Sequence, residues 1–320
     1  MTLFGIDAGG TTTRLAVRDE AGSAFIRTYP SLNPASVADP SSSWEIALRA
    51  IAAHDGDLHG WIGSASVTKA TLGAEIARLR SAADKAGATG RVVLSNDMLP
   101  LLMGPPLDGV GTAVTVGTGT SFLARNPRGD LAAASGYEFL LSDEGGAFDI
   151  GLRGLQAAGR AFDGRSRETA LLRAAVELYG FDIPELGRHL AGLVRPKPEI
   201  SRFAPLVCTC GETGDTVASE VLDGAVDAIV TGVAAVRRRI GTADTTILLA
   251  GGVIAGCRAI ATSVKEQLTV QWSSAEVVTV PDGAESALAL AVRSARLAPD
   301  AIETLSGGLP CAVVTFGGGH

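Results

Sequence analysis

The sequence predicts an α/β protein of two domains, each containing a sheet covered by helices. A chain of 320 residues is too long for one compact core and about right for two domains with a cleft between them. Apolar segments with strand character alternate with helical ones. A strand, a glycine turn and a threonine-rich return occur twice, at Asp7–Thr13 and at Val116–Ser121, which suggests a duplicated unit.

The first hundred residues carry the clearest local signals. Leu3–Asp7 is a short apolar run, and β-branched residues return at Thr11–Val17 after a turn, so the pair predicts a hairpin. Further elements are expected at residues 44–53 (helix), 61–63 (an apolar segment), 72–85 (helix) and 91–94 (strand). The last of these strands leads directly to Ser95-Asn96-Asp97.

Proline, glycine and an acidic residue at Pro105–Gly109 mark the expected domain boundary. We therefore assign residues 1–110 to a first domain and 111–299 to a second. Residues 300–320 lack clear periodicity and are left as a tail. Within the second domain we expect a strand at 112–116, mostly helices over 151–239, a strand at 245–249 and a final helix at 283–296.

Composition excludes several classes of protein. The formal net charge is -7 and the longest basic run is Arg237–Arg239, which argues against nucleic acid as a partner. Apolar runs stop after a few residues, too short to cross a bilayer, and the first residues lack the pattern of a secretion signal. Four cysteines are too few for a disulfide framework in a chain of this length. We expect a cytoplasmic protein.

The first glycine turn has the chemistry of a phosphate loop. Gly9 and Gly10 carry no Cβ, so backbone N–H groups can approach phosphate oxygens, and the hydroxyls of Thr11 and Thr12 add donors. Asp7 at the end of the strand can hold Mg²⁺ through water, because Mg²⁺ keeps several waters and takes few protein ligands. A dinucleotide fingerprint is disfavoured because that motif must open a helix. A plain hairpin turn remains an equal alternative.

Two further glycine motifs follow apolar strands, and an aspartate stands between the first and second motifs. The motifs comprise Gly117, Thr118, Gly119 and Thr120, and then Gly251 and Gly252. Each is weak alone, because glycine-threonine turns are common and paired glycines also serve helix packing. Asp97 ends a strand, where it could act as a base or cap a helix from Met98. These two roles do not exclude each other.

The three motifs in this order, with Asp97 between the first two, resemble the phosphate-1, phosphate-2 and adenosine motifs of the sugar kinase, Hsp70 and actin superfamily. Ser95–Asp97, Gly117–Thr120 and Gly136–Gly146 further resemble the N-acetylglucosamine kinase branch of the BadF/BadG/BcrA/BcrD ATPase family. The resemblance covers residues 3 to about 296. It implies a two-domain actin-like ATPase (ribonuclease H-like) fold with duplicated mixed sheets.

The same resemblance implies an activity and the residues that perform it. ATP and Mg²⁺ would serve to phosphorylate a hydroxyl, the 6-OH, of an amino sugar such as N-acetylglucosamine or glucosamine. Asp97 would take the proton from the sugar hydroxyl, while Asp143 and Asn33 would bind sugar hydroxyls. An amide and a carboxylate suit a polyol, since each can fix several hydroxyls. Asn33 could equally be an ordinary turn residue before Pro34.

The sugar-binding segment departs from the family pattern. Tyr137 and Glu138 replace the family's Trp-Gly, Ser142–Gly146 replaces its Gly-Asp-Glu-Gly-Ser, and Pro34-Ala35 replaces an aromatic residue. We include Tyr137 and Glu138 among the substrate-binding residues. The added carboxylate of Glu138 could pair with the free amino group of glucosamine, or it could point to solvent.

The strongest alternative is an ATP-hydrolysing activator of a dehydratase or reductase, a role that also occurs in this broad family. Such activators carry an iron-sulfur cluster and place a cysteine just before the Gly-Thr-Gly segment. Val116 occupies that position here. The sequence leaves open which sugar is used and whether the chain forms a homodimer.

Overall fold

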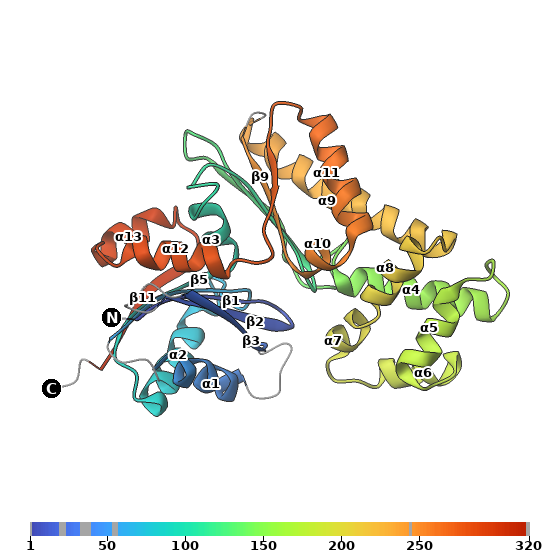
Figure 1. The fold of residues 1–320 in the computed structure, drawn as a ribbon, viewed down its shortest axis with the longest axis horizontal. Helices are drawn as coiled ribbons and strands as arrows, with labels where there is room; N and C mark the ends of the chain where they lie inside the picture. Colours follow the sequence, from blue (N-terminus) through green and yellow to red (C-terminus); the bar gives the residue numbers. More distant parts are fainter. Residues whose placement is uncertain (1, 19–23, 33–39, 53–56, 243–244, 318–320) are drawn as a thin grey trace. The chain divides into compact units, whose positions relative to one another are not determined.

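The computed structural model describes residues 2–18, 24–32, 40–52, 57–242 and 245–317. The chain folds as two compact units, and both combine a sheet with helices, so the predicted α/β class is confirmed. Unit 1 comprises Met1–Ala113, Arg125–Leu131 and Asp282–His320, and unit 2 comprises Val114–Ala124 and Ala132–Pro281. The labels in Figure 1 are used from here on.

Unit 1 contains a six-stranded mixed sheet in the order β11-β5-β4-β1-β2-β3. Its strands are β1 (Thr2–Ala8), β2 (Thr12–Arg18), β3 (Ala24–Pro30), β4 (Leu58–Ser64), β5 (Gly90–Asn96) and β11 (Cys311–Phe316). The predicted hairpin of β1 and β2 is confirmed as an antiparallel pair that aligns Asp7 with Arg14. β1, β4 and β5 run parallel, so their carboxyl ends lie at one edge of the sheet.

Helices cover both faces of this sheet (Figure 1). They are α1 (Pro40–Ala52), α2 (Leu72–Ala86), α3 (Met98–Met103), α12 (Ala284–Ser294) and α13 (Pro299–Leu305). Figure 1 shows α1 and α2 on one face and α3, α12 and α13 on the other. Trp44 and Leu48 of α1 are fully buried with Leu79 of α2 in the core under the first face. Burial of such apolar side chains is the main force that holds the layers together.

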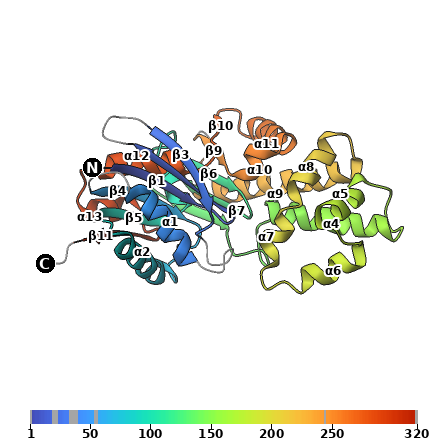
Figure 2. The same cartoon turned by 60° about the horizontal axis from the view of Figure 1, so that its bottom comes forward.

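Unit 2 contains a five-stranded sheet in the order β10-β9-β6-β7-β8. Its strands are β6 (Gly111–Val116), β7 (Thr120–Arg125), β8 (Leu131–Ser135), β9 (Ile247–Ala250) and β10 (Val277–Thr279). Its helices are α4 (Ala147–Phe162), α5 (Ala170–Tyr179), α6 (Ile183–Ala191), α7 (Pro196–Ser201), α8 (Ala204–Glu212), α9 (Thr216–Ile240), α10 (Gly252–Gly256) and α11 (Arg258–Gln271). Figure 2 shows α4 to α8 gathered as one helical group, which agrees with the predicted helical region.

The C-terminal segment differs from the expected division of the chain. The helix expected at 283–296 is α12, and it belongs to unit 1 rather than to the second domain. α12 packs closely on β1, because a Cβ added at Gly5 would overlap the backbone at Leu288. The tail also has a place in unit 1, since β11 pairs antiparallel with β5 and aligns Val313 with Val93.

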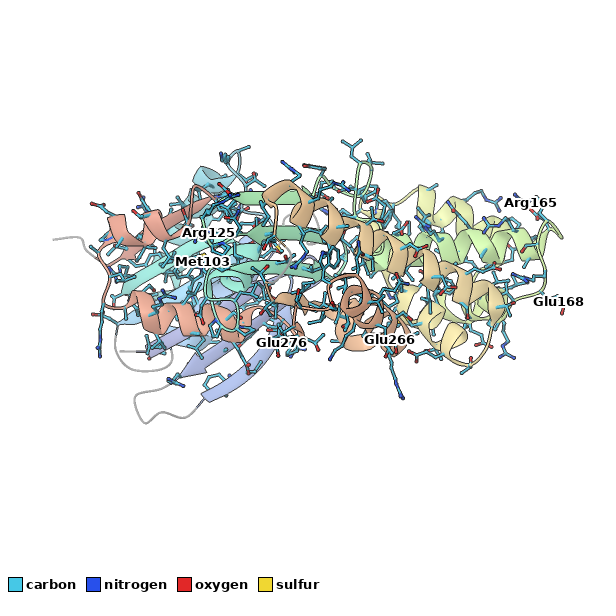
Figure 3. The ribbon with its side chains drawn as sticks, turned by 90° about the horizontal axis from the view of Figure 1, so that it is seen from above. Met103, Arg125, Arg165, Glu168, Glu266 and Glu276 are labelled. Atoms are coloured by element: carbon cyan, nitrogen blue, oxygen red, sulfur yellow. The ribbon has the colours of Figure 1, made fainter. Side chains whose placement is uncertain are left out.

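The loop between β7 and β8 is anchored within unit 1. A guanidinium nitrogen of Arg125 lies 3.9 Å from the sulfur of Met103 at the end of α3, and Figure 3 shows these two side chains close together.

Among the helices of the described segments, none combines the length and apolar character required to span a membrane.

Candidate active site

The predicted phosphate-1 turn connects β1 to β2. Gly9 and Gly10 are half-buried, and the side chains of Thr11 and Thr12 are exposed. The carbonyl oxygen of Gly9 accepts a hydrogen bond of 2.9 Å from the hydroxyl of Ser31, which ties the turn to the end of β3. The turn therefore presents small residues and hydroxyl donors at the carboxyl edge of the sheet. Asn33, the predicted sugar contact, lies outside the described residues.

Asp7 is a half-buried carboxylate at this edge. Burial raises the pKa of Asp7 to about 7, against the opposing effect of a hydrogen bond from the backbone N–H of Gly283. That N–H donates to Asp7 Oδ2 over 2.8 Å. The negative charges of Asp97 and Asp282 raise the pKa further, and Arg14 lowers it. Because a desolvated carboxylate close to two other acidic groups favours a cation, Asp7 fits the predicted contact with hydrated Mg²⁺.

Sequence reasoning missed the residues that surround Asp7. Asp282 Oδ2 lies 3.4 Å from Arg14 Nε, and Asp282 Oδ1 accepts a hydrogen bond of 2.9 Å from the N–H of Ala284 at the start of α12. A short acidic side chain just before a helix often accepts a hydrogen bond from a backbone N–H two residues later, so this bond could have been predicted. Its position beside Asp7 could not, because Gly283 and Asp7 are 276 positions apart in the chain.

Asp97 follows β5 directly at the same edge as Asp7. The registers of the parallel strands align Asp7 with Gly63 of β4 and Gly63 with Ser95 of β5. A Cβ added at Gly63 would lie 3.2 Å from the Cα of Asp97, so this glycine allows the close approach. Asp97 and Asp7 therefore belong to one group of charges, and their electrostatic interaction contributes to the raised pKa of Asp7.

Asp97 does not cap the helix that it precedes. The side chain of Asp97 makes no capping hydrogen bond to α3. The N–H of Met98 donates to Asn96 Oδ1 over 3.0 Å. Burial raises the pKa of Asp97 to about 6, while the backbone N–H groups of Asp97 and Met98 oppose part of that rise. The pKa of this carboxylate is thus close to neutral pH, which suits a general base.

The predicted phosphate-2 turn joins β6 to β7 in unit 2. The N–H of Gly117 donates to the carbonyl oxygen of Gly119 over 2.9 Å, which closes the turn. The first residues of α4 pack onto it, because the N–H groups of Ala147 and Phe148 donate to the carbonyl oxygens of Gly117 and Thr118 over 2.8 and 3.0 Å. The turn is therefore fixed by the amino end of a long helix.

The predicted adenosine motif lies beside this turn. Gly251 follows β9 and has a φ of 105°, a conformation that favours glycine. A Cβ at Gly251 would lie 2.5 Å from the carbonyl oxygen of Val116, the residue just before Gly117. The structure thus brings the second and third motifs together within unit 2. Gly252 begins α10, and a Cβ there would meet no atom within 4 Å.

Asp143 is held against the phosphate-2 turn. Only 5% of its side chain is exposed, and its Oδ1 accepts a hydrogen bond of 3.1 Å from the N–H of Thr120. Its Oδ2 lies 2.7 Å from Nζ of Lys197, a residue that sequence reasoning missed. A carboxylate oxygen has two lone pairs, so both oxygens retain capacity for sugar hydroxyls.

Tyr137 and Glu138 lie on the loop that leads to Asp143. The side chain of Tyr137 is exposed, and its N–H donates to the hydroxyl of Ser142 over 2.8 Å. Oε2 of Glu138 lies 3.3 Å from Nζ of Lys197. The carboxylate that could have paired with the amine of glucosamine therefore already has a cationic partner in the protein.

The chain matches the BadF/BadG/BcrA/BcrD ATPase family over residues 4–291. It is 25% identical over 211 residues, 65% of this chain and 69% of the other, to an N-acetylmuramic acid/N-acetylglucosamine kinase from Clostridium acetobutylicum.

Two solved structures share the fold. A candidate N-acetylglucosamine kinase from Chromobacterium violaceum has a TM-score of 0.71 and 22% identity, with 91% of this chain and 98% of that one covered. A second, from Porphyromonas gingivalis, has a TM-score of 0.68 and 17% identity, with 90% and 98% covered. Since the family match spans most of the chain, the protein belongs to the BadF/BadG/BcrA/BcrD ATPase family and has the predicted two-domain actin-like ATPase fold.

Proposed function

We propose that the protein is an ATP-dependent kinase that phosphorylates a hydroxyl group, the 6-OH, of an amino sugar such as N-acetylglucosamine. The observation that carries the proposal is Asp97, a half-buried carboxylate with a raised pKa that lies at the same sheet edge as the phosphate-1 turn and makes no capping hydrogen bond. The name of the Clostridium acetobutylicum relative supports the sugar class.

Asp97 acts as the general base in this reaction. Its carboxylate accepts the proton of the sugar hydroxyl while the hydroxyl oxygen bonds to the γ-phosphorus of ATP and the bond from that phosphorus to the β,γ-bridging oxygen breaks. ADP leaves with the electron pair of the broken bond. A pKa of about 6 keeps Asp97 mostly ionised at neutral pH, while its basicity exceeds that of an ordinary carboxylate.

The two glycine turns bind the phosphates. Backbone N–H groups around Gly9 and Gly10 and the hydroxyls of Thr11 and Thr12 donate hydrogen bonds to some of the phosphate oxygens of ATP. The segment 117–120 donates to others. Asp7 would hold Mg²⁺ through water, and the bound ion would supply positive charge that neutralises the phosphate oxygens. Gly251 and Gly252 allow the adenosine to lie flat against the backbone.

The pH dependence of the reaction follows from the pKa of Asp97. The base works only when deprotonated, and burial raises its pKa to about 6. At saturating Mg²⁺, which keeps Asp7 ionised, we expect kcat/KM for the sugar to be constant above neutrality and to fall by about tenfold per pH unit below pH 6, because each unit removes nine-tenths of the ionised form of Asp97. Rates measured from pH 4.5 to 8 test this expectation. The affinity for ATP, measured over the same range, separates the ionisation of the nucleotide from that of Asp97. A rate that is level down to pH 5 would contradict it.

A coupled assay of ADP release decides the proposed function. The acceptors are N-acetylglucosamine, glucosamine, glucose and N-acetylmannosamine, each with and without Mg²⁺. We expect Mg²⁺-dependent ADP release with an amino sugar and slow release without sugar. Fast hydrolysis that no sugar changes would favour the ATP-driven activator instead.

A further inference from the structure

Lys197 forms an ion cluster with two acidic residues of the candidate sugar-binding segment. Its Nζ lies 2.7 Å from Asp143 Oδ2 and 3.3 Å from Glu138 Oε2. The exposed fractions of the side chains are 21% for Lys197, 5% for Asp143 and 68% for Glu138. The ammonium group thus lies at the boundary between the buried carboxylate and the exposed one, where solvent screens its charge less than at the surface.

The ammonium group is held in this position by its surroundings. Lys197 lies in the first turn of α7, and its carbonyl oxygen accepts a hydrogen bond of 2.7 Å from the hydroxyl of Ser201. Nζ lies 5.7 Å from the centre of the Phe139 ring, within the range of a cation-π contact. Phe139 in turn packs against Phe148 of α4, with ring centres 4.9 Å apart. An aromatic pair, of which Phe148 is buried and Phe139 half-buried, and two carboxylates therefore orient one flexible side chain.

The two acidic residues adopt a backbone conformation that side chains rarely accept. The φ angles are 66° at Glu138 and 77° at Asp143, and such positions in non-glycine residues are found at functional sites where the surroundings hold them. Asp143 is held by Thr120 N–H and by Lys197, whereas Glu138 has Lys197 as its charged partner. Lys197 is the contact that the two residues share.

The charge of this cluster bears on the choice of sugar. Two carboxylates without Lys197 would attract a cation such as the ammonium group of glucosamine. With Lys197 the cluster has one positive and two negative groups, and a cationic substrate would meet a fixed like charge beside Asp143. An N-acylated sugar has no charge at this position, and its hydroxyls can still use the free lone pairs of Asp143.

We propose that Lys197 determines the specificity of the proposed kinase, because its ammonium group occupies the acidic cluster and so favours an uncharged N-acylated sugar over a cationic amino sugar. The inference rests on the proposed function and goes beyond it. Lys197 acts through Asp143 and Glu138, so it is a positioning and specificity residue rather than a catalytic one.

The test compares kcat/KM for N-acetylglucosamine and glucosamine at pH 6.5, where an ordinary amine is protonated. We expect Lys197→Met to lower the ratio of N-acetylglucosamine to glucosamine by at least about tenfold, mainly through a lower KM for glucosamine. Lys197→Arg keeps the charge and should keep the ratio. Lys265→Met removes an exposed lysine of α11 in the same unit. This control should leave kcat/KM unchanged for both sugars.

A second substitution separates charge from folding. Glu138→Gln added to Lys197→Met removes one of the two uncompensated carboxylates, so the double variant should recover part of the wild-type ratio. An unchanged ratio in Lys197→Met, or an equal loss with both sugars that Glu138→Gln does not alter, would overturn the specificity role. If the wild-type protein phosphorylates neither sugar, the proposed function fails and the inference fails with it. The wild-type measurement alone distinguishes this outcome from a failure of the specificity role.

Discussion

Replacing Asp97 by asparagine should lower kcat by about two to four orders of magnitude while ATP still binds. Asparagine has nearly the same shape, so the start of α3 and the hydrogen bond from Met98 to Asn96 should persist. What is lost is the carboxylate that accepts the proton. Steady-state rates with the sugar identified by the screen give kcat, and calorimetric titration gives the affinity for a non-hydrolysable nucleotide.

The matched control for this variant is Glu75→Gln. Glu75 of α2 is a buried acid of unit 1, 1% exposed, and burial raises its pKa as well. It pairs with Arg78 and has no proposed part in the reaction. We therefore expect its loss to affect stability but not the chemical step. Turnover of Asp97→Asn within tenfold of the wild type would refute the assignment of Asp97 as the base.

The parts of the fold that the sequence predicted well are those set by neighbouring residues. The hairpin of β1 and β2 was predicted from a glycine turn and the return of β-branched residues after it, and the strand that leads to Asp97 was expected at residues 91–94. Both signals act over a few positions, because a turn and a strand are specified by local backbone preferences. The same holds for α2 (Leu72–Ala86), which was expected as a helix at residues 72–85.

The C-terminal segment shows where local reasoning stops. The run Cys311–Phe316 contains Val313, Val314 and Thr315, which favour a strand, yet its partner β5 is more than 200 positions earlier in the chain. Likewise, nothing near α12 indicates that the helix packs on Gly5. A local sequence pattern predicts a strand or a helix but not the distant element that it pairs with or packs on. The return of the chain to unit 1 could therefore not be predicted.

Lys197 was missed for the same reason. It lies on a helix of six residues, in a region where the sequence shows only helical character, and it contacts Asp143 over a separation of 54 positions. A lysine on a short helix between two prolines is most often a solvated side chain. Only the folded structure shows that its ammonium group contacts Asp143 and Glu138.

The second large effect is expected at the phosphate-2 turn, where Gly119 and Asp143 are in close contact. A Cβ added at Gly119 would overlap the carboxylate of Asp143. That carboxylate cannot move without losing its bonds to Thr120 N–H and to Lys197. We expect Gly119→Ala to lower kcat/KM by about two orders of magnitude, because the displaced Asp143 no longer holds the turn or the sugar, and to lower Tm by several degrees.

Gly117→Ala is the matched control, because it adds the same methyl group to the same turn. A Cβ at Gly117 would meet no protein atom within 4 Å, so Tm should stay within a degree or so of the wild type. Its affinity for ATP then reports whether phosphate oxygens approach the backbone at this glycine, since a methyl group would keep them away. Equal Tm values for Gly119→Ala and the wild type, with kcat/KM retained, would show that Asp143 moves freely and does not position the turn.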